Sequence, residues 1–594
     1  MLMEIKKQVI KSLPVEWDIK PHDLVVPPDS KMGDLSLACF GLAKKLDKSP
    51  VEVALEVVEF CHPERSAKRE VEGSIGKVQK DSSVASLLQN DVVGGLLEKV
   101  EVAGPYVNFF LNPGVVANLV LVDIQKKKNK YGQSNIKKGE NILIEYPSNN
   151  THKEVHVGHL RIMCLGNALA NIYETLGAKV IRANYINDFG AHVAKCLWGL
   201  MELHRGEKPP ADKQKWLGQI YAEASTYLKD HPEHVEESKA MLKMLEAKDK
   251  YIWKTFLQTR QWSLDGFKKI FAELGVKHKI VFYEKNVKDL GQKEVGELLK
   301  KNIAEVGEGG AIIIDLKKYG LDIGLLRKSD GAGLYLTSDL GLAKVKAQKL
   351  PQVTSSINLT GAEQKFYFQQ LFKILEIGGF KYKMSHVACE MVTLPGGEKM
   401  ASRSGNVILY EMVRDEALQI AEAETQKRHP EWSKTKLQKT AEALAFGALK
   451  FSMIKVGSGQ KIAFDIKEAV SFEGFTAPYL QYSLARMNSI LEKVKTKLKV
   501  DSSLLVSVFE KKLILKLASM TEALQEAGEK QDPSQLAKYL FELCQDFSDF
   551  YENCPVMRAE TPQLLAGRLG LIKTTKQVLE NGLNILGVPI IKEM

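Results

Sequence analysis

The stretch NILIEYPSNNTHKEVHVGHLRIMCLGNALANIYETLGAKVIRAN, residues 141–184, determines the fold of the central part of the chain. Its apolar start, residues 141–146, predicts a short buried strand. Apolar side chains then recur at helical spacing over residues 165–176, and the glycine that follows predicts the end of that helix. Residues 179–184 predict a second strand. The stretch therefore predicts a β-α-β unit whose helix begins at the tetrapeptide HVGH, residues 156–159.

This tetrapeptide has the features of a phosphate-binding helix start. The first turn of a helix offers free backbone N–H groups and the positive end of the helix dipole. Gly158 has no Cβ, so an anion can approach the backbone closely. His156 and His159 are three residues apart, so both can face that anion and donate hydrogen bonds to it. Together these features predict a site for a nucleoside triphosphate.

The tetrapeptide by itself also allows a chance match or a metal site. A motif of four residues occurs by chance in many chains. Two histidines could belong to a metal site, although no cluster of Cys, Asp or Glu stands beside them at the spacing of metal ligands. The prediction therefore depends on what else the chain carries.

Length and composition limit the class of protein. A chain of 594 residues predicts three or four domains, and 44% hydrophobic with 26% charged residues is ordinary for a soluble globular protein. No run of 18 apolar residues and no secretory-type start is present, so we expect a cytoplasmic protein without a membrane span. Seven scattered cysteines without a C-x-x-C pair argue against disulfides and against structural zinc. The net charge of +10 favours a polyanionic partner only as strongly as it favours a lysine-rich solvated surface.

Residues 1–115 differ in their pattern of predicted helices and strands from the centre of the chain, and they predict a separate α+β domain. Residues 37–46 and 50–60 predict two helices, and residues 104–110 predict a turn followed by an edge strand. Residues 62–82 are polar, charged and poorly patterned, so we interpret them as an inserted loop without an assigned function.

Residues 116–465 alternate strand-like and helix-like stretches, which predicts a doubly wound parallel sheet of the Rossmann type within a multidomain α/β protein. The long, mixed-charge stretch 205–260 predicts a helical insertion, and residues 307–315 predict a turn and a strand. Residues 466–594 predict an all-α helical bundle. Within it, Asp532-Pro533 and Thr561-Pro562 predict helix starts, each with an N-cap residue followed by proline.

A second candidate for phosphate binding lies far downstream, at residues 397–406, GEKMASRSGN. Glycines bound this short run, which holds Lys399 and Arg403. A flexible basic loop of this kind can clamp a triphosphate as charge develops on it. Alone it would be interpreted as a surface turn. Together with HVGH at the other end of the α/β region, it predicts the second half of a split ATP site.

The two motifs resemble the ATP motifs of class I aminoacyl-tRNA synthetases, and the chain resembles the arginyl-tRNA synthetases nearly end to end. The segments that carry the resemblance are residues 33–46, 104–111, 145–161, 182–192, 329–343, 399–407, 472–486 and 584–594. The resemblance implies an N-terminal tRNA-binding domain at 1–115, a catalytic domain at 116–465 and an anticodon-binding helical domain at 466–594.

The resemblance also implies an arginine pocket. A guanidinium group requires carboxylates in a fixed fork geometry, and the resemblance places Glu145 and Asp339 there. Asn150, Tyr335 and Gln364 would orient the rest of the amino acid. Tyr335 and Asp339 are four residues apart, so they can share one helix face. Without the resemblance, Glu145 would be interpreted as an exposed strand end and Asp339 as a carboxylate at a helix N-terminus.

The implied ATP-binding residues are His156, Gly158, His159, Lys399, Met400, Ser402 and Gly405. The loop departs from the family's usual K-M-S-[ST]-R form, because Ala401 replaces a serine and Ser402 stands where many class I enzymes have a second lysine. Lys153 is the expected replacement for that cation, and Arg403 could supply part of the same charge. Tyr367 stands where a histidine is frequent, and no role is assigned to it.

The expected reaction joins arginine to tRNA(Arg) through an arginyl-adenylate. The arginine carboxylate attacks the α-phosphate of ATP in line, and the tRNA terminal ribose hydroxyl then attacks the adenylate. His156 and His159 would donate to the phosphates, while Lys153, Lys399 and Arg403 would neutralise pyrophosphate. Mg²⁺ is expected with ATP, and no metal site in the protein. The resemblance implies that arginine activation requires tRNA.

Two alternatives to this function remain open. The chain could be another class I synthetase or a small-molecule adenylyltransferase, although the additional terminal domains argue against the latter. It could also be a catalytically inactive RNA-binding relative. The argument against this is that the expected catalytic residues are all present: His156, His159, Lys399 and Arg403. The expected partners are tRNA(Arg), L-arginine and ATP, and nothing in the sequence requires more than a monomer.

Overall fold

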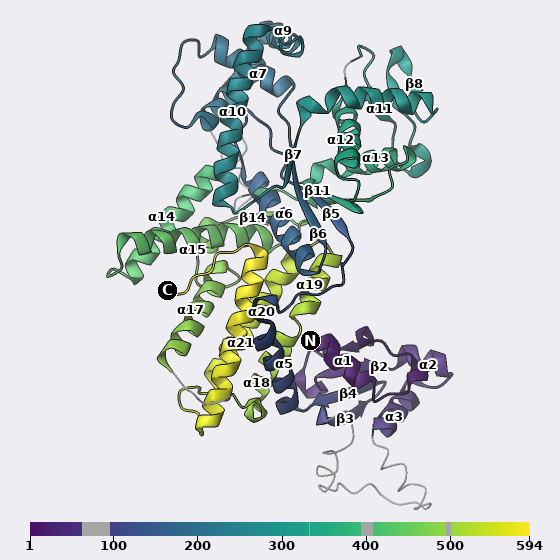
Figure 1. Ribbon diagram of the computed structural model, residues 1–594, viewed down its shortest axis with the longest axis vertical. Helices are drawn as coiled ribbons and strands as arrows, with labels where there is room; N and C mark the ends of the chain where they lie inside the picture. The colour runs from purple at the N-terminus through teal and green to yellow at the C-terminus, as the bar shows by residue number, and fades with distance from the viewer. Residues whose placement is uncertain (62–94, 332, 394–407, 495–499) are drawn as a thin grey trace, which may run out of the picture.

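The computed structural model describes residues 1–61, 95–331, 333–393, 408–494 and 500–594, and the predicted loop at 62–82 lies outside these ranges. Three parts follow one another along the chain (Figure 1). A small N-terminal part lies beside the lower end of a long helical bundle, and an α/β part lies above that bundle. No helix of the described residues is long and apolar enough to cross a membrane.

The N-terminal part is an antiparallel sheet covered by helices, in the order β1-β2-β4-β3. Its elements are α1 (Leu2–Ile10), β1 (Leu24–Val25), β2 (Leu35–Ala38), α2 (Phe40–Leu46), α3 (Pro50–Cys61), β3 (Leu97–Ala103) and β4 (Tyr106–Leu111). The edge strand predicted at 104–110 is wrong in its position, because β4 pairs with both β2 and β3. The helix predicted from residue 37 begins only at Phe40, because residues 35–38 pair with β4.

The centre of the molecule is a five-stranded parallel sheet in the order β12-β11-β5-β6-β7. Its strands are β5 (Asn141–Glu145), β6 (Lys179–Ile186), β7 (Ile280–Tyr283), β11 (Ser355–Gly361) and β12 (Lys383–Cys389). The chain builds outward from β5 to β6 and β7, and returns to the other side of β5 with β11. This reversal opens a crevice at the carboxyl ends of β5 and β11, where doubly wound sheets bind ligands. The predicted Rossmann-type sheet is confirmed.

Alternation along β5 explains why helices cover both faces. Ile142 and Ile144 belong to the large core shared with α6, whereas Leu143 belongs to a separate cluster on the other face. The predicted helix, α6 (Val157–Thr175), begins at the HVGH tetrapeptide and joins β5 to β6. It is buried between the sheet and three helices from later in the chain, α15 (Lys434–Ile454), α19 (Met520–Glu529) and α21 (Pro562–Leu586). The predicted β-α-β unit is therefore confirmed.

Two insertions rise from the carboxyl ends of the strands and stand apart at the top of Figure 1. The helical insertion between β6 and β7 holds α7 (Ala191–Glu202), α8 (Lys213–Asp230), α9 (Val235–Glu246) and α10 (Lys250–Glu273), longer at both ends than predicted. The second holds α11 (Lys288–Lys300), β8 (Glu305–Val306), β9 (Ile312–Ile314), β10 (Gly324–Arg327) and α12 (Tyr335–Lys349). The turn and strand predicted at 307–315 correspond to the turn before β9 and to β9 itself.

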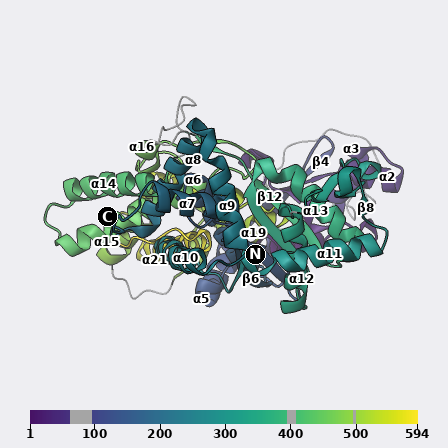
Figure 2. The same cartoon turned by 90° about the horizontal axis from the view of Figure 1, so that it is seen from above.

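The remaining helices lie outside the N-terminal sheet and the two insertions. They are α5 (Pro113–Lys127), α13 (Lys365–Ile377, between β11 and β12), α14 (Tyr410–Arg428), α15 (Lys434–Ile454), α16 (Ile466–Ala469), α17 (Ala477–Lys493), α18 (Val508–Ala518), α19 (Met520–Glu529), α20 (Ser534–Asn553) and α21 (Pro562–Leu586), with the short strand pair β13 (Val392–Thr393) and β14 (Ile462–Ala463). Seen from above, α14 and α15 lie opposite α11 and α12, with α6 and α7 between them (Figure 2).

The terminal part is helical, as predicted. The start of α21 is confirmed, because Thr561 accepts a hydrogen bond from the Leu564 N–H at 3.1 Å. The start of α20 lies one residue later than predicted, at Ser534, whose N–H donates to Asp532 at 3.0 Å. Helix α5 packs on α18 and α21, so the segment that leads into the parallel sheet first lies along the terminal helices.

Candidate active site

A cavity of about 740 Å³ lies at the carboxyl ends of β5 and β11. Every predicted site residue within the described part of the chain lines it: Glu145, Asn150, Lys153, His156, Gly158, His159, Tyr335, Asp339 and Gln364. The other predicted residues, Lys399, Met400, Ser402, Arg403 and Gly405, lie outside the described residues. Residues far apart in the sequence therefore meet at the crevice that the strand order creates.

The start of α6 fixes the two histidines through their own backbone. His156 is the N-cap, and its Nδ1 accepts a hydrogen bond from the Gly158 N–H at 3.1 Å. The His156 N–H in turn donates to Nδ1 of His159 at 3.3 Å. A neutral imidazole has one donor and one acceptor nitrogen, so these contacts assign the hydrogen of each ring to Nε2. Both rings, whose centroids are 3.8 Å apart, thus have an Nε2–H group free of these backbone contacts.

Burial keeps both histidines uncharged near neutral pH. It lowers the pKa of His156 to about 4, and the nearby charge of Lys153 adds to the effect. Burial, His156 and Lys153 together lower the pKa of His159 well below its usual value. These side chains can therefore bind an anion as hydrogen-bond donors and not as cations. A Cβ at Gly158 would lie 2.9 Å from the His156 ring, so this glycine first of all makes room for that imidazole.

Glu145 is buried at the end of β5 and already has two partners. Its Oε1 accepts a hydrogen bond from Asn358 Nδ2 at 2.9 Å, and its Oε2 lies 2.8 Å from Lys346 Nζ. This excludes the interpretation of Glu145 as an exposed strand end. Neither partner was predicted from the sequence. Lys346 follows Asp339 by seven residues on α12, a spacing that returns to the same helix face and could have indicated it.

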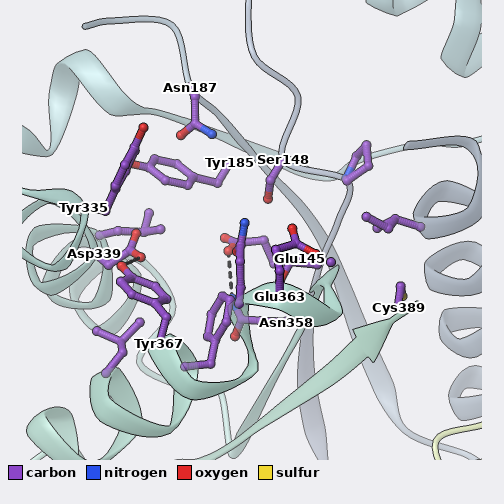
Figure 3. A pocket seen from close by; sticks show the side chains of 18 of the residues that line it. Glu145, Ser148, Tyr185, Asn187, Tyr335, Asp339, Asn358, Glu363, Tyr367 and Cys389 are labelled. Atoms are coloured by element: carbon purple, nitrogen blue, oxygen red, sulfur yellow. Dashed lines mark hydrogen bonds between the residues drawn. The ribbon is translucent and has the colours of Figure 1, made fainter. Parts of the chain in front are cut away.

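Asp339 and Tyr367 form the opposite wall of the cavity (Figure 3). The Tyr367 hydroxyl donates to Asp339, which gives a role to a residue that the sequence left unassigned. Burial, with the neighbouring charge of Glu145, raises the pKa of Asp339 to about 6. Tyr335, one turn earlier on α12, is 74% exposed at the mouth of the cavity. Asp339 is therefore more than a carboxylate that stabilises the N-terminus of a solvent-exposed helix.

A further carboxyl group, which the sequence did not indicate, is electrostatically coupled to Asp339 although it does not line the cavity. Glu284 follows the end of β7, and burial together with the charges of Asp188 and Asp339 raises its pKa to about 8. Asp188 is compensated by Arg260, whose Nε lies 2.5 Å from it. Raised pKa values show that the ionised forms of Asp339 and Glu284 are poorly compensated. A cation that entered this side of the cavity would relieve that cost.

Arg161 joins the HVGH helix to the opposite rim. Its guanidinium is fully buried and donates to the carbonyl oxygens of Glu390 at 2.7 Å and Gly457 at 2.8 Å. Glu390 and Met391 line the cavity after the end of β12.

Among the described residues, no group of three or more His, Cys, Asp or Glu side chains is placed to hold a metal ion.

Comparison with known proteins finds one family along nearly the whole chain. The family model "tRNA synthetases class I (R), catalytic domain" matches residues 120–465, the "DALR anticodon binding domain" matches 480–594, and the "Arginyl tRNA synthetase N terminal domain" matches 2–74. A Treponema denticola protein named arginine–tRNA ligase is 32% identical over 605 residues, covering 98% of this chain and 96% of that protein. A Lactococcus lactis protein of the same name is 33% identical over 569 residues, covering 95% and 94%.

Two solved structures share the fold. The Thermus thermophilus arginyl-tRNA synthetase superposes with a TM-score of 0.79 at 24% identity, over 100% of this chain and 99% of that one. The Plasmodium falciparum arginyl-tRNA synthetase does so with a TM-score of 0.73 at 18% identity, over 99% and 98%.

Proposed function

The chain belongs to the arginyl-tRNA synthetases of class I and joins arginine to tRNA(Arg) with ATP, and we propose that the cavity between β5 and β11 is where arginine is activated. The observation that carries the proposal is the division of the cavity. One side holds the carboxyl groups of Glu145 and Asp339, and the other holds a helix start with two neutral histidines and a lysine.

The carboxyl side is the proposed guanidinium pocket. Asp339 is the carboxylate that offers an oxygen to the substrate, since its proton-donating partner is the uncharged Tyr367. Glu145 presents a second acceptor whose orientation Lys346 and Asn358 fix, and this matches the planar fork of guanidinium donors. Tyr335 covers the mouth of the pocket.

The remaining contacts to the amino acid come from the neighbouring rim of the cavity. We assign Asn150 to the α-amino or carboxylate end of arginine and Gln364 to orienting the rest of the amino acid, since both line the same cavity. Glu284 does not line the cavity but is coupled to Asp339, so the charge of a bound guanidinium would also favour the ionised form of Glu284.

The helix start is the proposed phosphate site. His156 and His159 donate through Nε2–H, Gly158 belongs to the same turn, and Lys153 supplies positive charge. Lys399, Met400, Ser402, Arg403 and Gly405 are proposed to complete the clamp. The chain on either side of them supports this, because Met391 lines the cavity and Leu409 pairs with the backbone of His156. We propose that ATP binds as its Mg²⁺ complex.

The reaction then needs positioning and charge stabilisation. The arginine carboxylate attacks the α-phosphorus in line, and the bond to the bridging oxygen of pyrophosphate breaks. Two imidazole donors stabilise the charge that develops on the phosphate oxygens, and Lys153 neutralises the departing pyrophosphate. The terminal ribose hydroxyl of tRNA attacks the adenylate carbonyl, and AMP leaves. We propose that the activation of arginine requires bound tRNA.

The outer parts of the chain are proposed to hold the tRNA. Residues 1–115 would contact its body, 466–594 its anticodon, and 116–465 would carry the chemistry; the family matches at both ends support this division. We propose a monomer in the cytoplasm. All seven cysteines are free and buried, which suits a reducing compartment. Light scattering at the mass of one chain tests the monomer.

Kinetics of two variants test the division of the cavity. We expect Asp339→Asn to raise the KM for arginine well above any change in the KM for ATP. We expect His159→Ala to lower kcat by on the order of 10²-fold, the usual cost of one transition-state donor. Equal changes of both KM values in Asp339→Asn, or normal turnover in His159→Ala, would contradict the assignment.

A further inference from the structure

One face of the inserted helix α8 lies against the loop segment Lys153–Glu154. Gln214 Nε2 donates to the Lys153 carbonyl oxygen at 2.9 Å. A Cβ at Gly218 would lie 2.2 Å from Glu154 Cγ and 2.9 Å from its backbone nitrogen, so only glycine allows this approach. The Tyr221 ring centroid lies 4.9 Å from Lys153 Nζ. Positions 214, 218 and 221 share one helix face.

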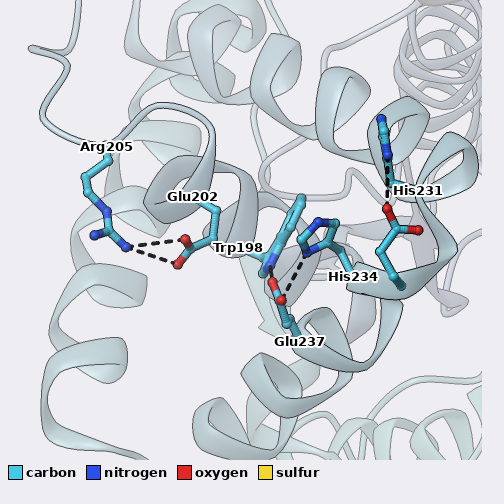
Figure 4. Close-up of polar contacts among 7 residues, drawn as sticks. Trp198, Glu202, Arg205, His231, His234 and Glu237 are labelled. Carbon is cyan, nitrogen blue, oxygen red and sulfur yellow. Dashed lines mark hydrogen bonds and ion pairs between the residues drawn. The ribbon is translucent and has the colours of Figure 1, made fainter.

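The rest of the insertion holds this arrangement in place. His152, the residue before Lys153, is fully buried, and its ring and N–H contact Thr259 at 2.8 Å and Ser263 at 3.0 Å on α10. Trp198 on α7 donates to Glu237 on α9 at 3.0 Å, as Figure 4 shows, so α7 and α9 are joined as well. The backbone that carries Lys153 is therefore fixed by two helices of one packed unit.

The kind of contact matters for a phosphate-binding lysine. Within the described ranges, no carboxylate forms an ion pair with Lys153. A carboxylate would hold the ammonium group but would also cancel its charge. The face of an aromatic ring attracts a cation without carrying a net charge of its own. Accordingly, the charge of Lys153 still acts on His156, His159 and His192, whose pKa values it helps to lower.

We propose that α8 positions Lys153 for the phosphate chain. Gln214 and Gly218 fix the backbone of Lys153. The ring of Tyr221 holds the ammonium group of Lys153 without cancelling its positive charge. Tyr221 is thus a positioning residue that acts through Lys153. The inference rests on the proposed role of Lys153 in neutralising pyrophosphate. It gives the helical insertion a part in ATP chemistry, in addition to its place in the fold.

The test compares variants of the full-length enzyme by tRNA-dependent ATP–pyrophosphate exchange. We expect Tyr221→Leu to lower kcat by roughly 3- to 20-fold, with little change in arginine affinity. This is about the rate effect expected from the loss of one cation–π contact, weaker where the contact is exposed to solvent and stronger where it is desolvated. Tyr221→Phe keeps the ring and should stay within about 2-fold of wild type. Tyr251→Leu, at a 68% exposed tyrosine on α10 of the same insertion, is the matched control and should leave kcat unchanged.

A double-mutant cycle decides whether Tyr221 acts through Lys153. In the Lys153→Ala background, we expect Tyr221→Leu to cause no additional loss. Gly218→Ala, which displaces Glu154, should lower kcat as Tyr221→Leu does, and this serves as the second route if the latter folds poorly. The inference is overturned if Tyr221→Leu has wild-type kcat, or if its loss is the same with and without Lys153. A Lys153→Ala enzyme with normal kcat would instead overturn the proposed role of Lys153 itself.

Discussion

The pKa of Asp339 should set the pH range in which the enzyme binds arginine. Burial raises this pKa to about 6, and a guanidinium requires the ionised carboxylate. Asp339 is then about 90% ionised at pH 7 and about 10% ionised at pH 5, so arginine affinity should fall about 10-fold between them. Neither His156 in the cavity nor Glu284, which is coupled to Asp339, titrates in this window. His156, with a pKa of about 4, stays neutral, and Glu284, with a pKa of about 8, stays protonated.

The assay is direct binding of arginine by calorimetry without ATP, from pH 5 to pH 7, on wild type and Asp339→Asn. The variant loses a charge-assisted hydrogen bond, so we expect it to bind on the order of 10- to 100-fold more weakly at pH 7. Its remaining affinity should not change with pH in this range. An affinity of the wild-type enzyme that is constant from pH 7 to pH 5 would show that the ionisation of Asp339 does not control binding.

The same shift predicts the sign of an effect on stability. The pKa of Asp339 is higher in the folded chain than the ordinary value of 3.8, so the folded state binds the proton more tightly. Stability therefore falls as pH rises through the window from about 4 to about 6. At pH 7 the ionised carboxylate of Asp339 lowers the free energy of unfolding. Asp339→Asn should consequently melt at the same or a higher temperature at pH 7 while it loses arginine, and a clear drop in Tm would contradict this.

Three further changes test separate parts of the site. Lys153→Ala should lower kcat in pyrophosphate exchange by on the order of 10²-fold, and near-normal turnover would remove Lys153 from the mechanism. Lys346→Met leaves the buried Glu145 without its counterion, so the KM for arginine should rise by about 10-fold or more, whereas an unchanged KM would show that the pair does not shape the pocket. Gly166→Ala should cost about 1–3 kcal/mol of stability, because its Cβ would lie 2.4 Å from the Tyr146 ring, and an unchanged Tm would contradict that packing.

Local patterns in the sequence were enough for the catalytic core. The strand 141–146, the start of α6 at His156 and its end near residue 176 each depend on a few neighbouring residues. The position of β4 in its sheet could not be predicted in the same way. Pairing on both sides depends on β2 and β3, which no periodicity within residues 104–110 reveals.

The residues of the candidate site could be proposed from the sequence, but their partners and protonation states could not. Glu145 and both histidines, which were predicted as site residues, line one cavity. It did not predict that Lys346 neutralises Glu145, since this depends on how α12 lies across the end of β5. It also did not predict that His156 and His159 are neutral, because that follows from burial and from the charge of Lys153.

Charging of total tRNA with labelled arginine, and with labelled lysine in parallel, is the most direct test of the proposed arginine pocket. The arrangement of Glu145 and Asp339 predicts ATP-dependent attachment of arginine and none of lysine, whose single ammonium group cannot match a planar fork. At subsaturating arginine, Asp339→Asn should lose most of that charging. Equal charging with lysine, or tight tRNA binding without any arginine attached, would contradict the assignment of this pocket.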